Sequence, residues 1–270
     1  MSRRRPPPGI VVVMNEPRTP SAALANISLE EDWHVHSTFS DGVSSMQENV
    51  RAAEVAGLST LCLVDHVRSD TPWVPEFVAE ARRVALGTDV RVLCGLEAKM
   101  LDTRGDLDLP ADHALADRLL IADHQLPSAG GPMDPTDVRD LIAAGDLTGD
   151  QVVEWLLLSY ERALERHQGA ILAHPFSLLP KMGLEPRRLR REGVSKLALV
   201  ARENGASIEI SERWRCPEPW VVKEFVLAGV RVIVSTDSHR ADTIGRYGYC
   251  REVLEGLRDP LRHVLKASPA

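Results

Sequence analysis

The sequence predicts an α/β fold, a (β/α) barrel of about seven strand-and-helix units. Short apolar runs alternate with amphipathic segments, a pattern typical of parallel strands joined by crossover helices. The 270 residues lie within the range of one such barrel, and no linker-like break divides them. Hydrophobic residues make up 44% of the chain and aromatic residues only 4%, as expected of strands buried on both faces.

One domain is expected over residues 27–270, preceded by a disordered tail over residues 1–26 that is rich in Pro, Arg and Ser. The apolar run at residues 10–14 is too short for a secretion signal. No run approaches the roughly 20 apolar residues that a membrane-spanning helix needs.

The net charge and the cysteines indicate which partners the protein does not bind and in which compartment it is found. A formal net charge of -7 argues against a broad basic surface, and so against non-specific binding to nucleic acid or to anionic membranes. The four cysteines include no Cys-x-x-Cys pair, and Cys62 and Cys94 fall in apolar runs where reduced, buried thiols are expected. These features predict a cytoplasmic protein.

The first half of the chain alternates strands and helices. After a first strand that carries His34 and His36, Ser44 is expected to cap a helix that ends near Ala56, and Gly57 suits its C-terminal stop. The next expected elements are a strand at 59–64, a helix at about 75–86 and a strand at 90–96.

A less regular region follows. The segment 99–110 resembles a hairpin or a loop, and three of its acids are expected to be solvated turn residues: Asp102, Asp106 and Asp108. A strand at 118–122 leads into a long loop with one short helix at 135–144, and such loops often line a substrate site.

The second half returns to regular alternation. Thr148 opens the most clearly periodic helix, which ends near His167. The remaining expected elements are a strand at 170–173, a basic helix at about 186–203, a strand at 207–210, a helix at 219–228 and a strand at 230–234. In a barrel of this kind, active sites lie at the C-terminal ends of the strands.

The stretch from Asp32 to Asp41, which Gly42 closes, carries two histidines and a carboxylate. His34 and His36 are two residues apart, and side chains at that spacing on a strand point to the same face. A polar turn then lets the chain fold back and present Asp41 to a neighbouring ion. Alone, the histidine pair is equally consistent with two half-exposed residues at a strand edge.

Further residues of metal-binding type follow the other expected strands. Nine such residues lie at strand ends: His34, His36, Asp41, His66, Glu97, His124, His174, Asp237 and His239. Each one alone is more typical of a hydrogen-bonding loop residue. Together they are too many for one tetrahedral zinc, and they predict two or three divalent ions, Zn²⁺, Mn²⁺ or Fe²⁺. Three other histidines, His113, His167 and His263, fall in helical or loop contexts and carry no such signal.

The ordered motifs resemble the PHP family, named for polymerase and histidinol phosphatase, over roughly residues 31–245. They are His-x-His-Ser-x-x-Ser-Asp-Gly, a strand ending Asp-His, a strand-end Glu, a later His, Ala-His-Pro, and Ser-x-Asp-Ser-His. The Ser-Asp-Gly spelling of the first motif is closer to the general phosphoesterase and polymerase-associated branch than to typical histidinol phosphatases.

The resemblance implies a distorted seven-stranded (β/α) barrel with a trinuclear metal centre. One ion would be held by His34, His36, Glu97 and Asp237, a second by Glu97, His124 and His174, and a third by Asp41, His66 and His239. Glu97 would then be shared by two ions.

Such a centre is suited to hydrolysis of phosphate esters. Two ions about 3.5–4 Å apart lower the pKa of a bridging water toward ~7 and neutralise charge on the phosphoryl oxygens. We expect the metal-activated hydroxide to be held by Glu97, His34 and His36, and Asp65 to orient the adjacent His66. The preferred hypothesis is a phosphomonoesterase whose partner is a small-molecule phosphoester.

Arginine is the preferred side chain for orienting a phosphate. Five arginines follow strand ends, although each is also consistent with a solvated surface residue: Arg68, Arg213, Arg215, Arg240 and Arg246. Arg213 is the best candidate because it directly follows the sixth strand, and Trp214 beside it would stack on a ring or cover the cleft.

Two alternatives stay open. A phosphodiesterase or nuclease acting on nucleotides or cyclic phosphates would be favoured by a basic groove, although the acidic total weighs against it. A non-catalytic, metal-stabilised module would be indicated by lost ligands, and here all nine positions are filled.

Overall fold

The computed structural model describes residue 24 and residues 26–258. The tail predicted for residues 1–26 lies almost entirely outside these residues, and so does His263. Within the described residues, no helix is both long enough and apolar enough to cross a lipid bilayer.

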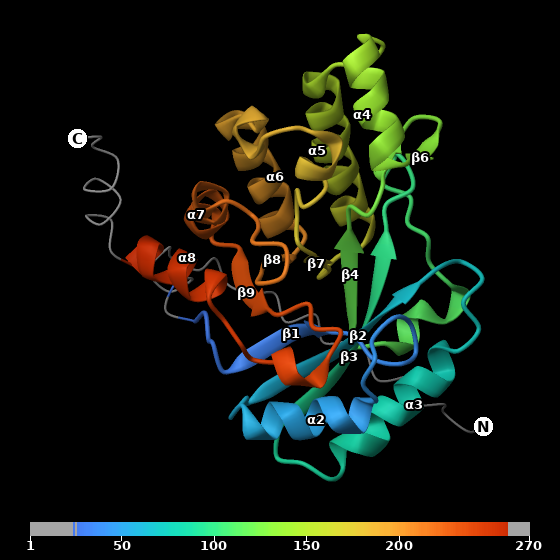
Figure 1. Cartoon of the computed structure of the whole chain (residues 1–270), viewed down its shortest axis with the longest axis vertical. Helices are drawn as coiled ribbons and strands as arrows, with labels where there is room; N and C mark the ends of the chain where they lie inside the picture. The colour runs from blue at the N-terminus through green and yellow to red at the C-terminus, as the bar shows by residue number, and fades with distance from the viewer. Residues whose placement is uncertain (1–23, 25, 259–270) are drawn as a thin grey trace, which may run out of the picture.

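Seven parallel strands form one sheet, in the order β1-β2-β3-β4-β7-β8-β9 (Figure 1). They are β1 Glu31–Val35, β2 Thr60–Val67, β3 Arg91–Lys99, β4 Arg118–Ala122, β7 Ile171–Leu172, β8 Ser207–Ser211 and β9 Arg231–Ser235. The order follows the sequence, so each strand is added at the same edge. This confirms the α/β fold and the predicted number of strands.

Helices lie around the outside of this sheet (Figure 1). The α-helices are α2 Met46–Val55, α3 Val74–Ala85, α4 Pro135–Ala144, α5 Gly149–Arg166, α6 Arg191–Glu203, α7 Pro219–Ala228 and α8 Tyr249–Arg258. In α3, for example, one apolar stripe that includes Val74, Phe77 and Ala81 is buried. Single 3₁₀ turns at Ala111–Leu115, Pro180–Met182, Pro186–Arg188 and Ala241–Thr243 complete the connections.

The sheet nearly closes into a barrel where the first strand meets the segment after the last. Val35 and Ser238 form a parallel bridge, and the His36 amide donates to the Ser238 carbonyl at 2.8 Å. The buried Asp32 carboxylate accepts hydrogen bonds from the Thr236 amide at 2.9 Å and from its hydroxyl at 2.6 Å. Closure therefore brings the first and last predicted ligand motifs side by side.

An apolar cluster fills the barrel below the strand ends that carry the predicted ligands. Its members are Trp33, Cys62, Val64, Leu93, Leu120, Ala122, Ile171, Ala173 and Ile233. The β1–β2 register shifts between Asp32 and Val35, and this irregularity allows the consecutive residues Trp33 and His34 both to face inward. Two arginines cover the Trp33 ring, with Cζ of Arg231 at 4.4 Å and Cζ of Arg118 at 5.9 Å from its centroid.

Several predicted element boundaries are wrong for local reasons. Ser45, rather than Ser44, caps α2, because Ser45 and Glu48 form a reciprocal capping box. The helix predicted from residue 186 begins at Arg191, because Leu189 and Arg190 are extended after the 3₁₀ turn. Strands β2 and β3 run past their predicted ends, so His66 and Glu97 lie within strands.

The two irregular regions also differ from expectation. The 99–110 segment is a hairpin-like excursion, but Asp102 is buried rather than solvated, because its carboxylate accepts a hydrogen bond from the Arg104 amide at 2.9 Å and pairs with that arginine's guanidinium. The long loop after β4 contains an unpredicted hairpin, β5 Leu126–Ser128 with β6 Gly131–Met133. The connection from β3 to β4 lies wholly within the described residues, and it contains one 3₁₀ turn and no α-helix.

Candidate metal centre

Glu97 lies at the floor of a cluster formed by the nine predicted ligands. Its carboxylate, fully buried, is within 2.8 to 3.6 Å of ring nitrogens from five histidines on four strands or strand ends: His34, His36, His66, His124 and His174. Five imidazoles around one carboxylate form a preorganised set of the ligand types that bind divalent transition metals.

Several buried polar atoms of this cluster have no hydrogen-bond partner among the described residues. They are Nε2 of His34, both ring nitrogens of His36, Oε2 of Glu97 and Oδ1 of Asp237. Buried polar groups are normally paired, so this concentration requires an explanation.

A divalent ion held among these side chains would pair the unpaired atoms. Glu97 Oε2 is 3.3 Å from His34 Nε2 and 3.6 Å from His36 Nε2, and that His36 atom is 3.4 Å from Asp237 Oδ1. Ligands at about 2.0–2.2 Å from one tetrahedral ion are themselves roughly 3.4 Å apart. Three of the side chains that the PHP resemblance assigns to one ion, His34, His36 and Glu97, have ligand atoms that all lie within 4.8 Å of one another, and Asp237 adjoins this group through His36.

Glu209 on β8 forms hydrogen bonds with the ring of His34 and with the backbone of His174. Nδ1 of His34 donates to Glu209 Oε1 at 3.2 Å, which leaves Nε2 of His34 facing Glu97. The same buried carboxylate accepts the His174 backbone amide at 2.7 Å, and the Ser235 hydroxyl donates to it. One carboxylate thus fixes a ring on β1 and the backbone that follows β7, where His174 adopts φ 29°.

We expect Glu209→Gln to weaken metal binding by about 10- to 100-fold, because the amide presents N–H groups to neighbours that are themselves donors. Metal content after dialysis against a graded series of chelator concentrations checks this. Glu224→Gln is the matched control, since Glu224 is also buried but pairs with Arg191 on the outside of the barrel. Equal metal retention by both variants would contradict the role of Glu209.

His174 is oriented by a second group of polar residues. Its Nε2 is 2.8 Å from Glu97, and its Nδ1 is 3.1 Å from the Ser177 hydroxyl, which donates to Asp123 at 2.9 Å. His124 completes this side of the cluster, with Nε2 at 3.0 Å from Glu97.

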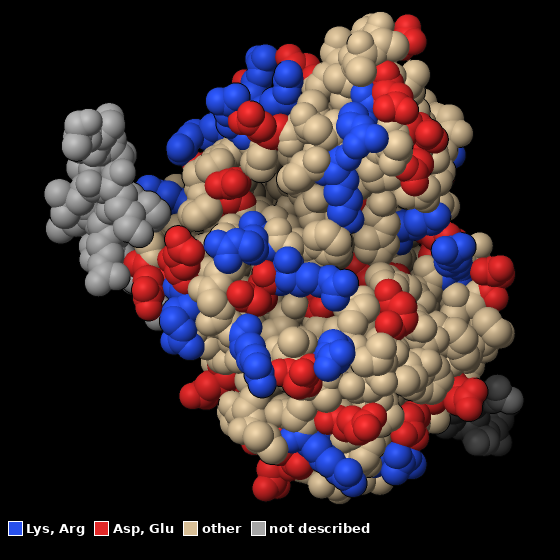
Figure 2. Space-filling model, viewed as in Figure 1, with Lys and Arg blue, Asp and Glu red and all other residues tan. Residues whose placement is uncertain are grey.

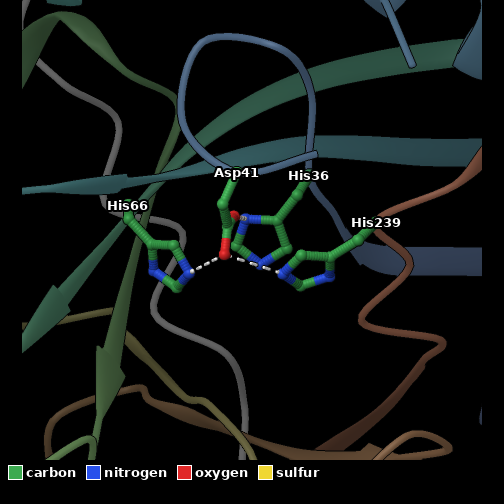
Figure 3. Close-up of side chains that lie close together, drawn as sticks. All are labelled: His36, Asp41, His66 and His239. Atoms are coloured by element: carbon green, nitrogen blue, oxygen red, sulfur yellow. Dashed lines mark hydrogen bonds and ion pairs between the residues drawn. The ribbon is translucent and has the colours of Figure 1, made fainter. Parts of the chain in front are cut away.

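The outer part of the cluster lies at the mouth of the barrel. His36, Asp41, His66 and His239 offer ligand atoms that all lie within 4.8 Å of one another. Figure 3 shows the Asp41 carboxylate between the rings of His66 and His239, at 3.5 Å and 3.2 Å. His36 belongs to this group as well as to the inner one, whereas the resemblance assigns it to the inner ion alone.

The loop that carries Asp41 is fixed by Asp65. The Asp65 carboxylate accepts hydrogen bonds from the amides of Ser37 and Ser40, both at 3.1 Å, and from their hydroxyls. That Asp65 orients His66 stays a prediction; among the described residues its carboxylate is linked to the His66 amide through the Ser40 hydroxyl. A Cβ on Gly42 would lie 2.7 Å from the His36 backbone, so only glycine allows the loop to return this closely.

The protonation of the cluster reflects its buried negative charge. Burial lowers the pKa of His36 to about 4, which leaves the neutral imidazole that a metal requires. Burial also acts to lower the pKa of His66, but hydrogen bonds to Asp41 and Glu97 outweigh it and raise this pKa to about 10. Burial raises the pKa of Glu97, yet the surrounding histidines hold it well below its usual range. Glu97 is therefore ionised, and its negative charge favours a cation beside it.

A cavity of about 570 Å³ opens beside the cluster. Of the arginines predicted to contact substrate, Arg68 and Arg213 line it. Arg213 also donates to the Asp237 carbonyl at 3.4 Å and lies 2.8 Å from Nδ1 of His239. Arg240 pairs with Asp242 and lines an adjoining hollow of about 300 Å³ together with Arg246.

Arg215 differs from the prediction made for it, whereas Trp214 lies at the cavity as expected. The Arg215 guanidinium lies over the Tyr249 ring and 3.7 Å from Glu252, so the structure places it outside the cavity. Trp214 lines the cavity, and Nζ of Lys181 lies 3.9 Å from its ring centroid. The indole Nε1 donates to the Asp237 carboxylate, which ties this side chain to the cluster.

Sequence reasoning missed Glu209, Lys99 and Gln125. Lys99 and Gln125 line the cavity, and each lies within two residues of a predicted ligand. Glu209 could have been noticed as a lone acid in the otherwise apolar strand Ser-Ile-Glu-Ile.

Comparison with known proteins gives a consistent result. The family model described as PHP domain matches residues 32–212. A probable phosphatase of Acetivibrio thermocellus is 25% identical over 252 residues, which cover 88% of this chain and 90% of the relative. A probable phosphatase of Pectobacterium carotovorum is 23% identical, with the same two coverages.

The fold is also similar to that of a solved structure. Histidinol phosphate phosphatase from Lactococcus lactis, solved with zinc, L-histidinol and phosphate, superimposes with a TM-score of 0.62 at 16% identity. The superposition covers 84% of this chain and 93% of that protein. At this identity the likeness concerns the fold, and it agrees with the seven-stranded barrel described above.

Proposed function

Because the chain belongs to the PHP domain family and is a phosphoric ester hydrolase, we propose that it hydrolyses a phosphomonoester of a small metabolite at a centre of three divalent ions. The observation that carries this proposal is the set of unpaired buried atoms on His34, His36, Glu97 and Asp237. The probable phosphatases named above support the reaction class.

The nine ligands would hold the ions in an inner and an outer part. His34, His36, Glu97 and Asp237 would hold the deepest ion. Glu97 would also hold a second ion together with His124 and His174. Asp41, His66 and His239 would hold the ion at the mouth, where Asp41 is half exposed. When bound, such ions acidify water to hydroxide near neutral pH and neutralise charge on a phosphoryl group.

The protein's own groups would bind and orient the substrate. Arg68 and Arg213 line the cavity and offer planar N–H donors to phosphoryl oxygens. Glu209 and Asp123 keep two ligand rings in place, so the cluster needs little reorganisation on binding.

The four cysteines are unpaired, and a cytoplasmic location stays a prediction.

The size and charge of the cavity favour a small substrate. Its volume of about 570 Å³ falls in the range typical of small-molecule sites. Figure 2 shows Lys and Arg side chains interspersed with Asp and Glu on the drawn face. A phosphodiester is the second candidate, because the adjoining hollow shares Arg213, Asp237 and His239 with the cavity and would accept the second ester arm.

Release of inorganic phosphate from a panel of monoesters and diesters by Mn²⁺- or Zn²⁺-loaded protein tests this proposal. We expect turnover of monoesters that is lost in His36→Ala. Turnover confined to diesters would establish the second candidate instead. Metal binding without hydrolysis of any substrate in a broad panel would indicate a non-catalytic, metal-stabilised module.

A further inference from the structure

Lys99, at the end of β3, is a cation of the cavity wall with no role in the metal cluster. It lies two residues after Glu97, and side chains two apart on a strand share a face. Since Glu97 faces the histidines inside the barrel, Lys99 also faces inward, about 6.6 Å farther along the strand toward the mouth. It accordingly lines the same cavity as His124 and His174.

The Lys99 amino group is held in place by one hydrogen bond and one long ion pair. Nζ donates to Gln125 Oε1 at 2.9 Å, and Asp108 Oδ2 is 3.9 Å away, at the outer limit of an ion pair. The Lys99 side chain is 21% exposed, so most of its stem is buried. An ammonium has three N–H donors, and the neutral Gln125 amide occupies one of them.

Asp108 is tied elsewhere. Its other carboxylate oxygen accepts the Ser69 amide at 2.7 Å, which joins the 99–110 excursion to the loop after β2. Gln125 directly follows His124 and lines the cavity as well. Lys99 is therefore positioned by a residue adjacent to a metal ligand, while its remaining donors are available to a bound anion.

We propose that Lys99 binds a non-bridging phosphoryl oxygen and thereby selects phosphomonoesters over phosphodiesters. This inference rests on the proposed function. A monoester presents three non-bridging oxygens and two negative charges, whereas a diester presents two oxygens and one charge. With two oxygens facing the ion-binding cluster, the third oxygen of a monoester is the one that remains for Lys99, and a diester carries an ester group in its place.

Removal of the ammonium should therefore affect the two ester classes unequally. With metal-loaded protein, Lys99→Met is expected to lower kcat/KM for 4-nitrophenyl phosphate by about 10- to 100-fold, the usual effect of losing a hydrogen bond to a charged group. For bis(4-nitrophenyl) phosphate the loss should stay within about threefold. A purely structural role would lower both rates by the same factor.

A binding measurement makes the inference independent of turnover. Calorimetric titration of the metal-loaded protein with inorganic phosphate should show a Kd about tenfold or more higher in Lys99→Met. Lys99→Arg keeps the charge and should restore most of this affinity, and it also replaces the methionine variant if that variant does not fold. Lys223→Met is the matched control, because Lys223 is exposed on α7 outside the cavity.

The outcomes separate the two proposals. If wild-type protein hydrolyses no monoester, the proposed function is overturned, and phosphate binding alone then decides the role of Lys99. If wild type hydrolyses monoesters but Lys99→Met binds phosphate within twofold of wild type, the role of Lys99 is overturned and the proposed function stands. An equal loss for monoester and diester would also overturn the selection by Lys99.

Discussion

Glu97→Gln should lower kcat/KM for a phosphomonoester by at least about 10³-fold, because metal ions contribute several kcal/mol to such reactions and each 1.36 kcal/mol is tenfold. Glu97 is the side chain that faces both the inner unpaired atoms and the histidines after β4 and β7. The amide keeps the size of the side chain but replaces one ligand oxygen by an N–H donor. It also removes the negative charge that balances the cations of the cluster.

The experiment is a steady-state assay with metal content measured on the same samples. Glu161→Gln serves as control, since Glu161 is buried on α5 and pairs with Lys196 away from the cavity. We expect the control to keep wild-type kcat/KM and metal content. A Glu97→Gln variant with activity within tenfold of wild type would show that the shared carboxylate is dispensable, and would refute the proposed centre.

Metal loading should raise the thermal midpoint of unfolding by about 10 °C. A ligand that binds only the folded state stabilises it by roughly 4 kcal/mol at a concentration 1,000 times its Kd. In chains somewhat shorter than this one, a stabilisation of about 1 kcal/mol raises the midpoint by about 2–4 °C. The physical reason is that Glu97 and Asp237 are buried charges whose ionic partners among the described residues are histidines, which must be protonated to pair with them.

Differential scanning calorimetry of chelator-treated protein, with and without added Zn²⁺ or Mn²⁺, measures this shift. Glu97→Gln should show a clearly smaller shift, because one shared ligand is lost. Mg²⁺ is a useful comparison ion, since it prefers an all-oxygen shell and should stabilise the protein much less than Zn²⁺. A midpoint that does not move with any divalent ion would contradict a resident metal centre.

The sequence predicted the barrel well because its signals are local and repeated. Helix α4 and strand β4 lie within their predicted bounds, since Pro135 and Gly145 mark the ends of that helix and an apolar run fills that strand. The predicted ligands converge because parallel strands place all their C-terminal ends at one rim. A residue at the end of any strand is therefore predicted to lie near the residues at the ends of the others.

The residues that sequence reasoning missed depend on contacts between distant strands. Glu209 supports His34 across 175 positions of sequence, and only the closed barrel brings them together. The hydrogen-bond donors of Asp65 could not be predicted, because the return of the chain at Gly42 decides which amides and hydroxyls reach the Asp65 carboxylate. Arg215 follows a strand end as predicted, but its φ of 48° is part of a turn whose direction the sequence does not specify.

The packing of Trp33 has a consequence for the order of events in turnover. Its buried indole, covered by Arg118 and Arg231, packs in the apolar cluster beneath the predicted ligands. Substrate and products would therefore use the entrance of the cavity, on the side of the cluster away from Trp33. An alcohol product lies nearer that entrance than a phosphate still bound at the floor, so the alcohol should depart first. Inorganic phosphate should then inhibit competitively with respect to the ester.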